Sequence, residues 1–264
     1  MESSNDEMAA KVAKDFRRTY DLGNAPINDL SDLIEGRLGI DVAIMDMDEG
    51  LDGMVLLDPH TNQKIISVAC SNSPERQRAT LAHELGHIEL KDFADGGVIQ
   101  CGARTDSEIR ADSFARHLLI PRDGVSEFLE GLGRKHRLLD ESDLSHLVRY
   151  FEVSPKVALI QLEADDWLVS GQKESWWSLS TGKLAARYGW SDDHLASRKR
   201  AQTPQAPMRI VAEAMAAYEN NLIGLEAVAR IRGIRPAALE AELKEVGIAP
   251  RQVELPATRF GRRK

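Results

Sequence analysis

The chain has 264 residues, of which 42% are apolar and 29% charged. This composition can supply a substantial hydrophobic core, which excludes a chain that is disordered throughout. No run approaches about 18 consecutive apolar residues, and the N-terminus lacks the basic start and apolar stretch of a secretory signal, so we expect no membrane span and a cytoplasmic location. The two cysteines, Cys70 and Cys101, are too few for a disulfide scaffold, and we expect buried, reduced thiols.

The net charge of −8 argues against a chain that binds nucleic acid nonspecifically over its whole length. The charge is uneven, because residues 1–170 carry 18 Lys/Arg against 32 Asp/Glu, whereas residues 171–264 carry 16 against 10. We interpret the chain as two units, an acidic first domain and a basic C-terminal region. A chance distribution of solvated charges explains the difference about as well as a functional one.

Two helices and a small sheet are predicted in the first 70 residues. Apolar residues recur at helical spacing over residues 6–20 and 27–38, and Gly39 suits the end of the second helix. Three short β-rich runs, DVAIMD, GMVLLD and KIISVAC, then alternate with residues that favour turns. We expect a three-stranded sheet, antiparallel because the connections are too short for crossovers.

The rest of the chain is predicted to be mostly helical. Ser73 and Pro74 suit the N-cap and the first position of a helix that reaches about residue 90, and a Gly- and Asp-rich loop separates it from a helix over residues 107–119. A loose basic tail is expected from Ala249. Further helices are expected at about 123–131, 142–151, 155–167, 207–220, 224–231 and 236–245.

All four tryptophans lie between Trp167 and Trp190. We expect this cluster to pack the C-terminal segment onto the first domain, in preference to forming a surface for a partner.

Residues 83–87, His-Glu-Leu-Gly-His, form the pattern HExxH inside a predicted helix. Residues four apart lie on one helix face, so His83 and His87 can reach one metal ion. Glu84 lies about 100° around the helix from His83, which suits a general base acting on water better than a third ligand. A shuffled chain of this composition would contain about 0.015 such patterns, so chance is a poor explanation.

A catalytic zinc site needs a third protein ligand, which we expect on the following helix. Glu108 lies 21 residues beyond His87 and can complete a site of two histidines and one glutamate. Asp112, one turn further along the same face, can accept a hydrogen bond from the free ring nitrogen of a liganding histidine. The competing interpretation is a capping box over residues 105–108, in which the Glu108 carboxylate folds back onto the backbone. One carboxylate cannot serve both roles at once.

The runs RATLAHELGHIEL, SEIRADSFARHLLIP and HLVRYFEVSPKVALIQL resemble the ImmA/IrrE family of bacterial and phage zinc metallopeptidases, over roughly residues 25–165. The resemblance implies zinc ligation by His83, His87 and Glu108, with Glu84 as the catalytic glutamate. Proteins of this family typically cleave a helix-turn-helix repressor of the XRE type, so the resemblance implies that substrate class.

The spacing of Glu108 and Asp112 also resembles the ExxxD pattern of thermolysin-like gluzincins, where the aspartate supports a ligand and does not bind the metal itself. The sequence departs mildly from the common form of the ImmA/IrrE family. Arg110 stands where a second acid is frequent, and LLIP replaces LLMP. Neither change touches the expected chemistry.

We therefore expect an α+β fold, with a small antiparallel sheet packed on the two ligand helices and a mostly helical C-terminal region after it. Residues 1–170 would form the zinc metallopeptidase domain, with helix-turn-helix-like helices at its end, and residues 171–264 the helical, basic region. The expected activity is a zinc-dependent endopeptidase with one Zn²⁺ per chain, which cleaves a repressor and so relieves repression.

The alternative is a non-proteolytic metal-binding regulator or scaffold, whose helix-turn-helix-like helices bind a partner protein or DNA. The second of these helices offers Lys156, Gln161 and Glu163 among apolar residues and lies in the acidic half, which favours packing over DNA contact. The more basic stretch LEAVARIRGIRPAALEAELKEVG leaves nucleic-acid binding through the C-terminal region open. The intact Glu84 favours the enzyme, since a structural metal site has no need of it.

Overall fold

The computed structural model describes residues 2–58, 60–61, 63–92, 98–100 and 105–251. These residues divide into two compact units, Met1–Gln205 and Ala206–Lys264. The predictions for Cys101 and for the basic tail beyond residue 251 lie outside the described residues, whereas Cys70 is a half-buried free thiol. In the described part of the chain, no helix combines the length and apolarity needed to cross a bilayer.

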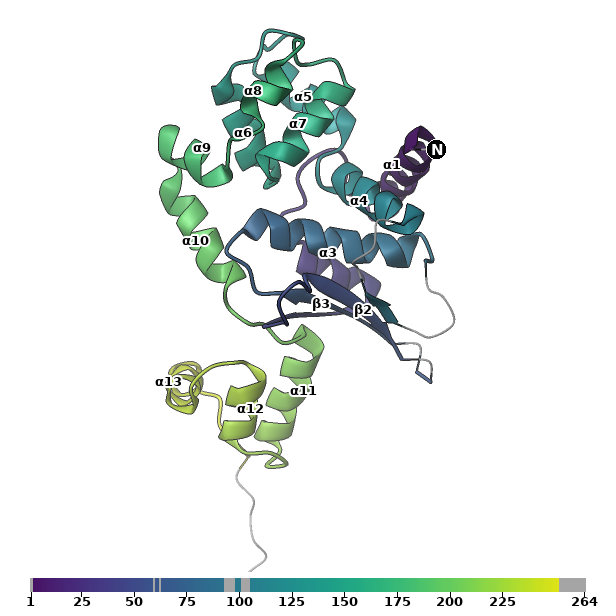
Figure 1. Ribbon diagram of the computed structural model, residues 1–264. Coiled ribbons are helices and arrows are strands. Elements are labelled where there is room, and N and C mark those ends of the chain that lie inside the picture. Colours follow the sequence, from purple (N-terminus) through teal and green to yellow (C-terminus); the bar gives the residue numbers. More distant parts are fainter. Residues whose placement is uncertain (1, 59, 62, 93–97, 101–104, 252–264) are drawn as a thin grey trace, which may run out of the picture. The chain divides into compact units, whose positions relative to one another are not determined.

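The first unit combines a small sheet with helices, so the predicted α+β class is confirmed (Figure 1). Its strands are β1 (Asp41–Met45), β2 (Gly53–Leu57), β3 (Lys64–Ala69) and β4 (Val98–Gln100). Its helical elements are α1 (Glu2–Thr19), α2 (Leu30–Leu33), the π-helical η1 (Ile34–Leu38), α3 (Pro74–Glu89), α4 (Asp106–Leu119), α5 (Arg122–Gly131), α6 (Glu141–Phe151), α7 (Pro155–Ala164), α8 (Gln172–Trp176), α9 (Thr181–Arg187) and α10 (Ser191–Ala201).

The sheet is mixed, so the prediction of an antiparallel sheet is wrong for one pair of strands. The strand order is β1-β3-β2-β4, with β1 parallel to β3 and β2 antiparallel to both β3 and β4. β2 runs back beside β3 on the side away from β1, so the chain reverses twice between β1 and β3 and the two strands point the same way. β4, in the predicted loop after α3, adds a fourth strand.

The two helices that carry the candidate ligands lie on one another over the sheet. α3 begins as predicted, with Ser73 as N-cap accepting a hydrogen bond from the Arg76 amide and Pro74 at the first helical position. Figure 1 shows α3 between the sheet and α4. Gly86 makes this approach possible, because a Cβ there would lie 3.0 Å from Phe114 Cδ1 and 3.3 Å from the Ala111 backbone.

The first unit ends at Gln205, later than the predicted boundary at residue 170. Trp190 explains the difference: its side chain is 7% exposed, belongs to the main core, and donates a hydrogen bond from Nε1 to Ser145 Oγ at 3.0 Å. Gln205 also pairs with β1, exchanging backbone hydrogen bonds of 2.8 and 2.9 Å with Ile44. Trp167 is fully buried as well, so two of the four tryptophans pack into the core of the first unit as expected, whereas Trp177 is 38% exposed.

A polar cluster around half-buried Asp6 joins α1 to α4. Asp6 accepts a hydrogen bond from Ser113 Oγ at 2.9 Å and contacts Arg116 and His117, with His117 Nε2 3.2 Å away. On its other side, His117 Nδ1 lies 3.4 Å from Gln161 Nε2 of α7. Burial, reinforced by the charge of Arg116, lowers the pKa of His117 to about 4. The ring is therefore neutral in the folded protein near neutral pH.

We expect His117 to make folding sensitive to acid. Its pKa is about 4 when folded and near the ordinary histidine value of 6.5 when unfolded, so the unfolded chain binds more protons between these values. The stability present above pH 6.5 is lost as the pH falls toward 4. Between pH 7 and pH 4, urea unfolding should show a loss on the order of 3 kcal/mol larger in wild type than in His117→Gln.

His146 on α6 is exposed and supplies a matched control, because His146→Gln should leave the wild-type pH dependence of unfolding unchanged. Equal pH slopes for wild type and His117→Gln would contradict the burial of a neutral ring at residue 117.

The second unit has its own small core. Its helices are α11 (Met208–Glu219), α12 (Leu225–Ile231) and α13 (Pro236–Val246). Their bounds lie within one residue of the predicted ranges. Val228, Ala229 and Leu239 are fully buried in the cluster that holds the three helices together.

Candidate metal centre

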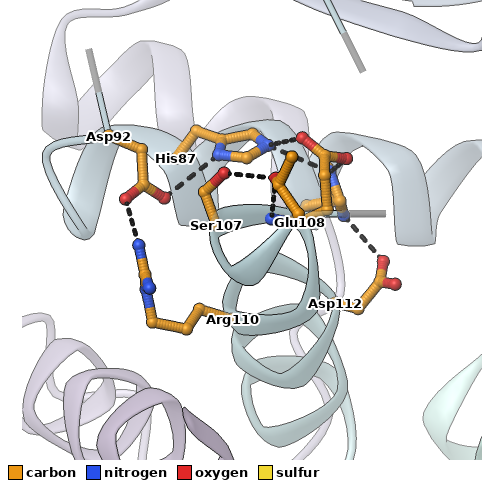
Figure 2. A network of polar contacts seen from close by, with 8 residues as sticks. His87, Asp92, Ser107, Glu108, Arg110 and Asp112 are labelled. Carbon is orange, nitrogen blue, oxygen red and sulfur yellow. Dashed lines mark hydrogen bonds and ion pairs between the residues drawn. The ribbon is translucent and has the colours of Figure 1, made fainter. Parts of the chain in front are cut away.

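The structure brings His83, His87 and Glu108 together, with one potential ligand atom of each within 4.8 Å of the others. Nε2 of His83 lies 3.1 Å from Nε2 of His87, one helical turn along α3. From α4, the Glu108 carboxylate places Oε2 3.3 Å from Nε2 of His83 and Oε1 3.2 Å from Nε2 of His87. Figure 2 shows His87 and Glu108 facing each other across the two helices.

The competing capping interpretation of Glu108 is settled by where its carboxylate lies. Thr105 is the N-cap of α4, and its side chain accepts a hydrogen bond from the Glu108 amide at 3.4 Å. The carboxylate of Glu108 turns instead to the two imidazoles. The backbone of this residue is therefore capped by Thr105, while its side chain is available to a metal.

The distances suit binding of one metal ion between the three side chains. Zinc bonds of about 2.0–2.1 Å to nitrogen and oxygen place neighbouring ligand atoms about 3.3 Å apart in a tetrahedral site. The two ring nitrogens are 3.1 Å apart, and each faces a different oxygen of the Glu108 carboxylate, Oε1 at 3.2 Å from His87 and Oε2 at 3.3 Å from His83. The donor set of two imidazoles and one carboxylate is also the one that catalytic zinc sites use. His83, His87 and Glu108 would hold the ion.

Both histidines are oriented through their other ring nitrogen. Nδ1 of His83 lies 2.8 Å from Asp112 Oδ1 on α4, the partner expected from the sequence. Nδ1 of His87 lies 3.2 Å from Asp92 Oδ2, just after the end of α3. A carboxylate at Nδ1 favours the tautomer that carries its proton there and leaves the Nε2 lone pair for a metal. The four residues thus present two nitrogens ready for ligation.

The electrostatics differ between the two rings. Burial acts against protonation of His83, but the hydrogen bond and charge of Asp112, together with Glu84 and Glu108, hold its pKa above the usual value. Burial and the neighbouring charge of His83 lower the pKa of His87. Carboxylates thus surround the two histidine rings with negative charge, and this environment favours the binding of a cation.

Glu84 is fully buried beneath β2. Its Oε1 lies 2.8 Å from the point where a Cβ at Gly53 would stand, and Cγ2 of Thr80 lies 2.6 Å from the same point. The charge of Glu84 helps to raise the pKa of His83, so the Glu84 carboxylate lies close to the candidate ligands. The absence of a side chain at Gly53 therefore creates the space that the Glu84 carboxylate occupies.

The comparisons with known proteins agree with this geometry. The family model described as the IrrE N-terminal-like domain of the M78 peptidases matches residues 35–163, which include every residue of the candidate centre. Residues 35–163 therefore carry an IrrE N-terminal-like domain, the domain of the ImmA/IrrE family. The radiation response metalloprotease IrrE of Deinococcus radiodurans is 32% identical over 167 residues, which make up 60% of this chain and 47% of that protein.

The chain thus spans about half the length of the curated relative that it matches. Among solved structures, a Mycobacterium tuberculosis transcriptional regulator is 19% identical with a TM-score of 0.36, over 65% of this chain and 48% of that one. The assignment of the domain rests on the two sequence matches.

Asp92 is a residue of the candidate centre that sequence reasoning missed. It lies five residues after His87, beyond the helix end, where helical spacing predicts no contact. Arg110, noted only as a departure from the family pattern, contacts Asp92 Oδ1 through Nη2 at 2.9 Å (Figure 2). An acidic residue just past the end of a helix that carries ligands is the sequence pattern that could have identified it.

Gly53→Ala should impair cleavage by the ImmA/IrrE domain without releasing its metal. The added methyl group would meet both Thr80 Cγ2 and Glu84 Oε1 at less than 3 Å, so the Glu84 carboxylate must move. A displacement on the order of 1 Å costs about 100-fold in rate. The measurements are the rate of protein cleavage and the metal content of the purified variant.

Gly36 supplies the control, because a Cβ there meets its nearest neighbour, Asp32 Oδ1, only at 3.9 Å. Gly36→Ala should cleave at the wild-type rate. A Gly53→Ala protein with full activity would show that Glu84 does not depend on this space.

Proposed function

We propose that the ImmA/IrrE domain of this chain is a zinc-dependent endopeptidase that cleaves a helix-turn-helix repressor of the XRE type. The observation that carries this proposal is the convergence of His83, His87 and Glu108 on one point, with the buried Glu84 carboxylate on the same turn of α3. The relative in Deinococcus radiodurans is a metalloprotease, which supports proteolysis. The substrate class rests on the family resemblance, and a repressor substrate would place the activity in the cytoplasm.

The chemistry follows from the roles that these residues can take. When bound, the metal ion supplies a Lewis acid that polarises a peptide carbonyl and lowers the pKa of water. Glu84 accepts the proton of the attacking water and then donates it to the leaving nitrogen. Asp112 and Asp92 keep the protons of His83 and His87 on Nδ1, so that both rings remain aligned through the reaction.

For the alternative of a DNA-binding regulator, α7 offers fewer side chains than its sequence indicated, because only Lys156 and Glu163 of the three polar residues are exposed. Gln161, one of the polar side chains that the second helix offered, is fully buried and accepts a hydrogen bond from Arg116 at 2.6 Å. It therefore cannot contact a base edge in a groove. This segment packs against α4 and contributes to the core of the first unit.

Incubation of the purified, zinc-loaded chain with XRE-type repressors encoded beside its gene tests the proposal. We expect one discrete pair of fragments from one repressor, and no fragments after addition of a chelator. Repressors that stay intact, together with tight and salt-dependent binding of the chain to duplex DNA, would overturn the proposal and favour the regulator.

A further inference from the structure

At the end of α3 the chain reverses direction, and this reversal brings the Asp92 carboxylate to the His87 ring. Lys91 adopts a left-handed conformation with φ 59°, and the Asp92 amide then donates a hydrogen bond to the His87 carbonyl at 3.0 Å. A left-handed residue after the last helical turn reverses the chain direction there. Asp92 Oδ2 consequently reaches Nδ1 of His87 at 3.2 Å, from the same helix terminus that holds the ring.

The two carboxylates that orient the histidines lie in different surroundings. The side chain of Asp92 is 9% exposed, whereas that of Asp112 is 78% exposed. A charged hydrogen bond that is shielded from water is stronger than one at the surface, where solvent screens it and competes for the acceptor. The Asp112 contact is the shorter of the two, 2.8 Å against 3.2 Å, but burial is the reason to expect the larger effect from Asp92.

Arg110 completes the buried group. Its Nη2 lies 2.9 Å from Oδ1 of Asp92, so that one carboxylate oxygen faces the guanidinium and the other faces His87. Arg110 stands two residues after Glu108 on α4. The ion pair thus links α4, which carries Glu108, to the Asp92 carboxylate, which orients His87 (Figure 2).

We propose that Asp92 and Arg110 are a pair of positioning residues that set how tightly the centre holds its metal, with a larger effect than Asp112. Asp92 aligns the His87 ring and keeps its Nε2 lone pair available, and Arg110 acts through Asp92 by holding the carboxylate in place. The inference rests on the metal binding of the proposed function, and it assigns Arg110 a task that an acidic residue at this position could not perform.

Zinc affinity of the full chain, measured by competition with a chromophoric chelator, tests the pair. Asp92→Ala should lower the affinity about 10–100-fold. The matched variant Asp112→Ala should lower it by less than about threefold, as expected for an exposed pair. Arg110→Gln should weaken binding in the wild-type background and add nothing in the Asp92→Ala background, because it acts through the same contact.

A second readout separates positioning from folding. In metal-free protein with ¹⁵N-labelled histidine, His87 should be in the Nδ1–H tautomer in wild type and in a mixture of tautomers in Asp92→Ala. Asp92→Asn keeps the shape of the side chain and serves if the alanine variant does not fold.

Three results would overturn the inference. These are Asp92 variants that bind zinc within about threefold of wild type, an Asp112→Ala protein that loses as much affinity as Asp92→Ala, and an unchanged His87 tautomer. A wild-type chain that binds no zinc would instead refute the proposed function itself.

Discussion

Glu84→Gln is expected to abolish cleavage of the repressor while one zinc per chain stays bound. The amide keeps the size of the carboxylate and fits the space beside Gly53, but it cannot accept the proton of the attacking water. Loss of a general base costs about 100- to 10,000-fold in rate. Gel-based cleavage rates and the metal content of the purified protein check both halves of this expectation.

Glu89→Gln provides the matched control, since Glu89 lies on α3 five residues after Glu84 and outside the ligand group. It should cleave at the wild-type rate. A Glu84→Gln variant that still cleaves would mean that another group removes the proton, and the mechanism proposed for this domain would be wrong.

Glu108→Ala is expected to lose the metal and with it all cleavage. Glu108 supplies the only carboxylate among the three groups that converge in the described part of the chain, and it faces both rings at 3.2–3.3 Å. Two histidines alone do not complete a catalytic site, which takes three protein ligands. The zinc content after dialysis should fall from about one per chain to near zero.

Asp106→Ala tests whether this loss is specific. Asp106 is an exposed acid in the same first turn of α4, and its contact is a 3.4 Å hydrogen bond from Asn5. It should retain zinc like the wild type. If Glu108→Ala also retained zinc with unchanged affinity, the centre would have to be rebuilt around another ligand.

Local chemistry made much of the first unit predictable. Ser73 and Pro74 mark the start of α3, and Gly39 ends η1 with φ 66°, because caps and left-handed glycines depend on residues next to one another. The strands β1, β2 and β3 were predicted within a residue of their bounds for the same reason. The helix expected over residues 27–38 is instead the short α2 followed by η1.

Features that depend on distant residues were missed. β1 and β3 can pair in parallel because β2 lies on the other side of β3. The lengths of the connections between the strands do not indicate on which side β2 lies. The helices α8, α9 and α10 between residues 172 and 201 went without a predicted range, since two of them have only 5 and 7 residues and the third has little amphipathic pattern.

The candidate centre divides in the same way. His83, Glu84 and His87 follow from one helical turn, and Glu108 and Asp112 from the next helix, so the spacing of the chain placed them as candidates. Asp92 depends on a left-handed residue after α3 and on Arg110 from α4. A backbone reversal and a contact between helices leave no periodic trace in the sequence.

The pairing of Ile44 with Gln205 has a consequence for any shortened form of this protein. Without the segment that follows α10, the amide and carbonyl of Ile44 would lose their partners, and an edge strand with more unpaired groups invites other chains to add to it. The hollow left by Trp190 would expose further apolar surface. A fragment that ends at residue 170 would therefore tend to self-associate, whereas one that continues through Gln205 keeps the pairing with Ile44 and the packing of Trp190.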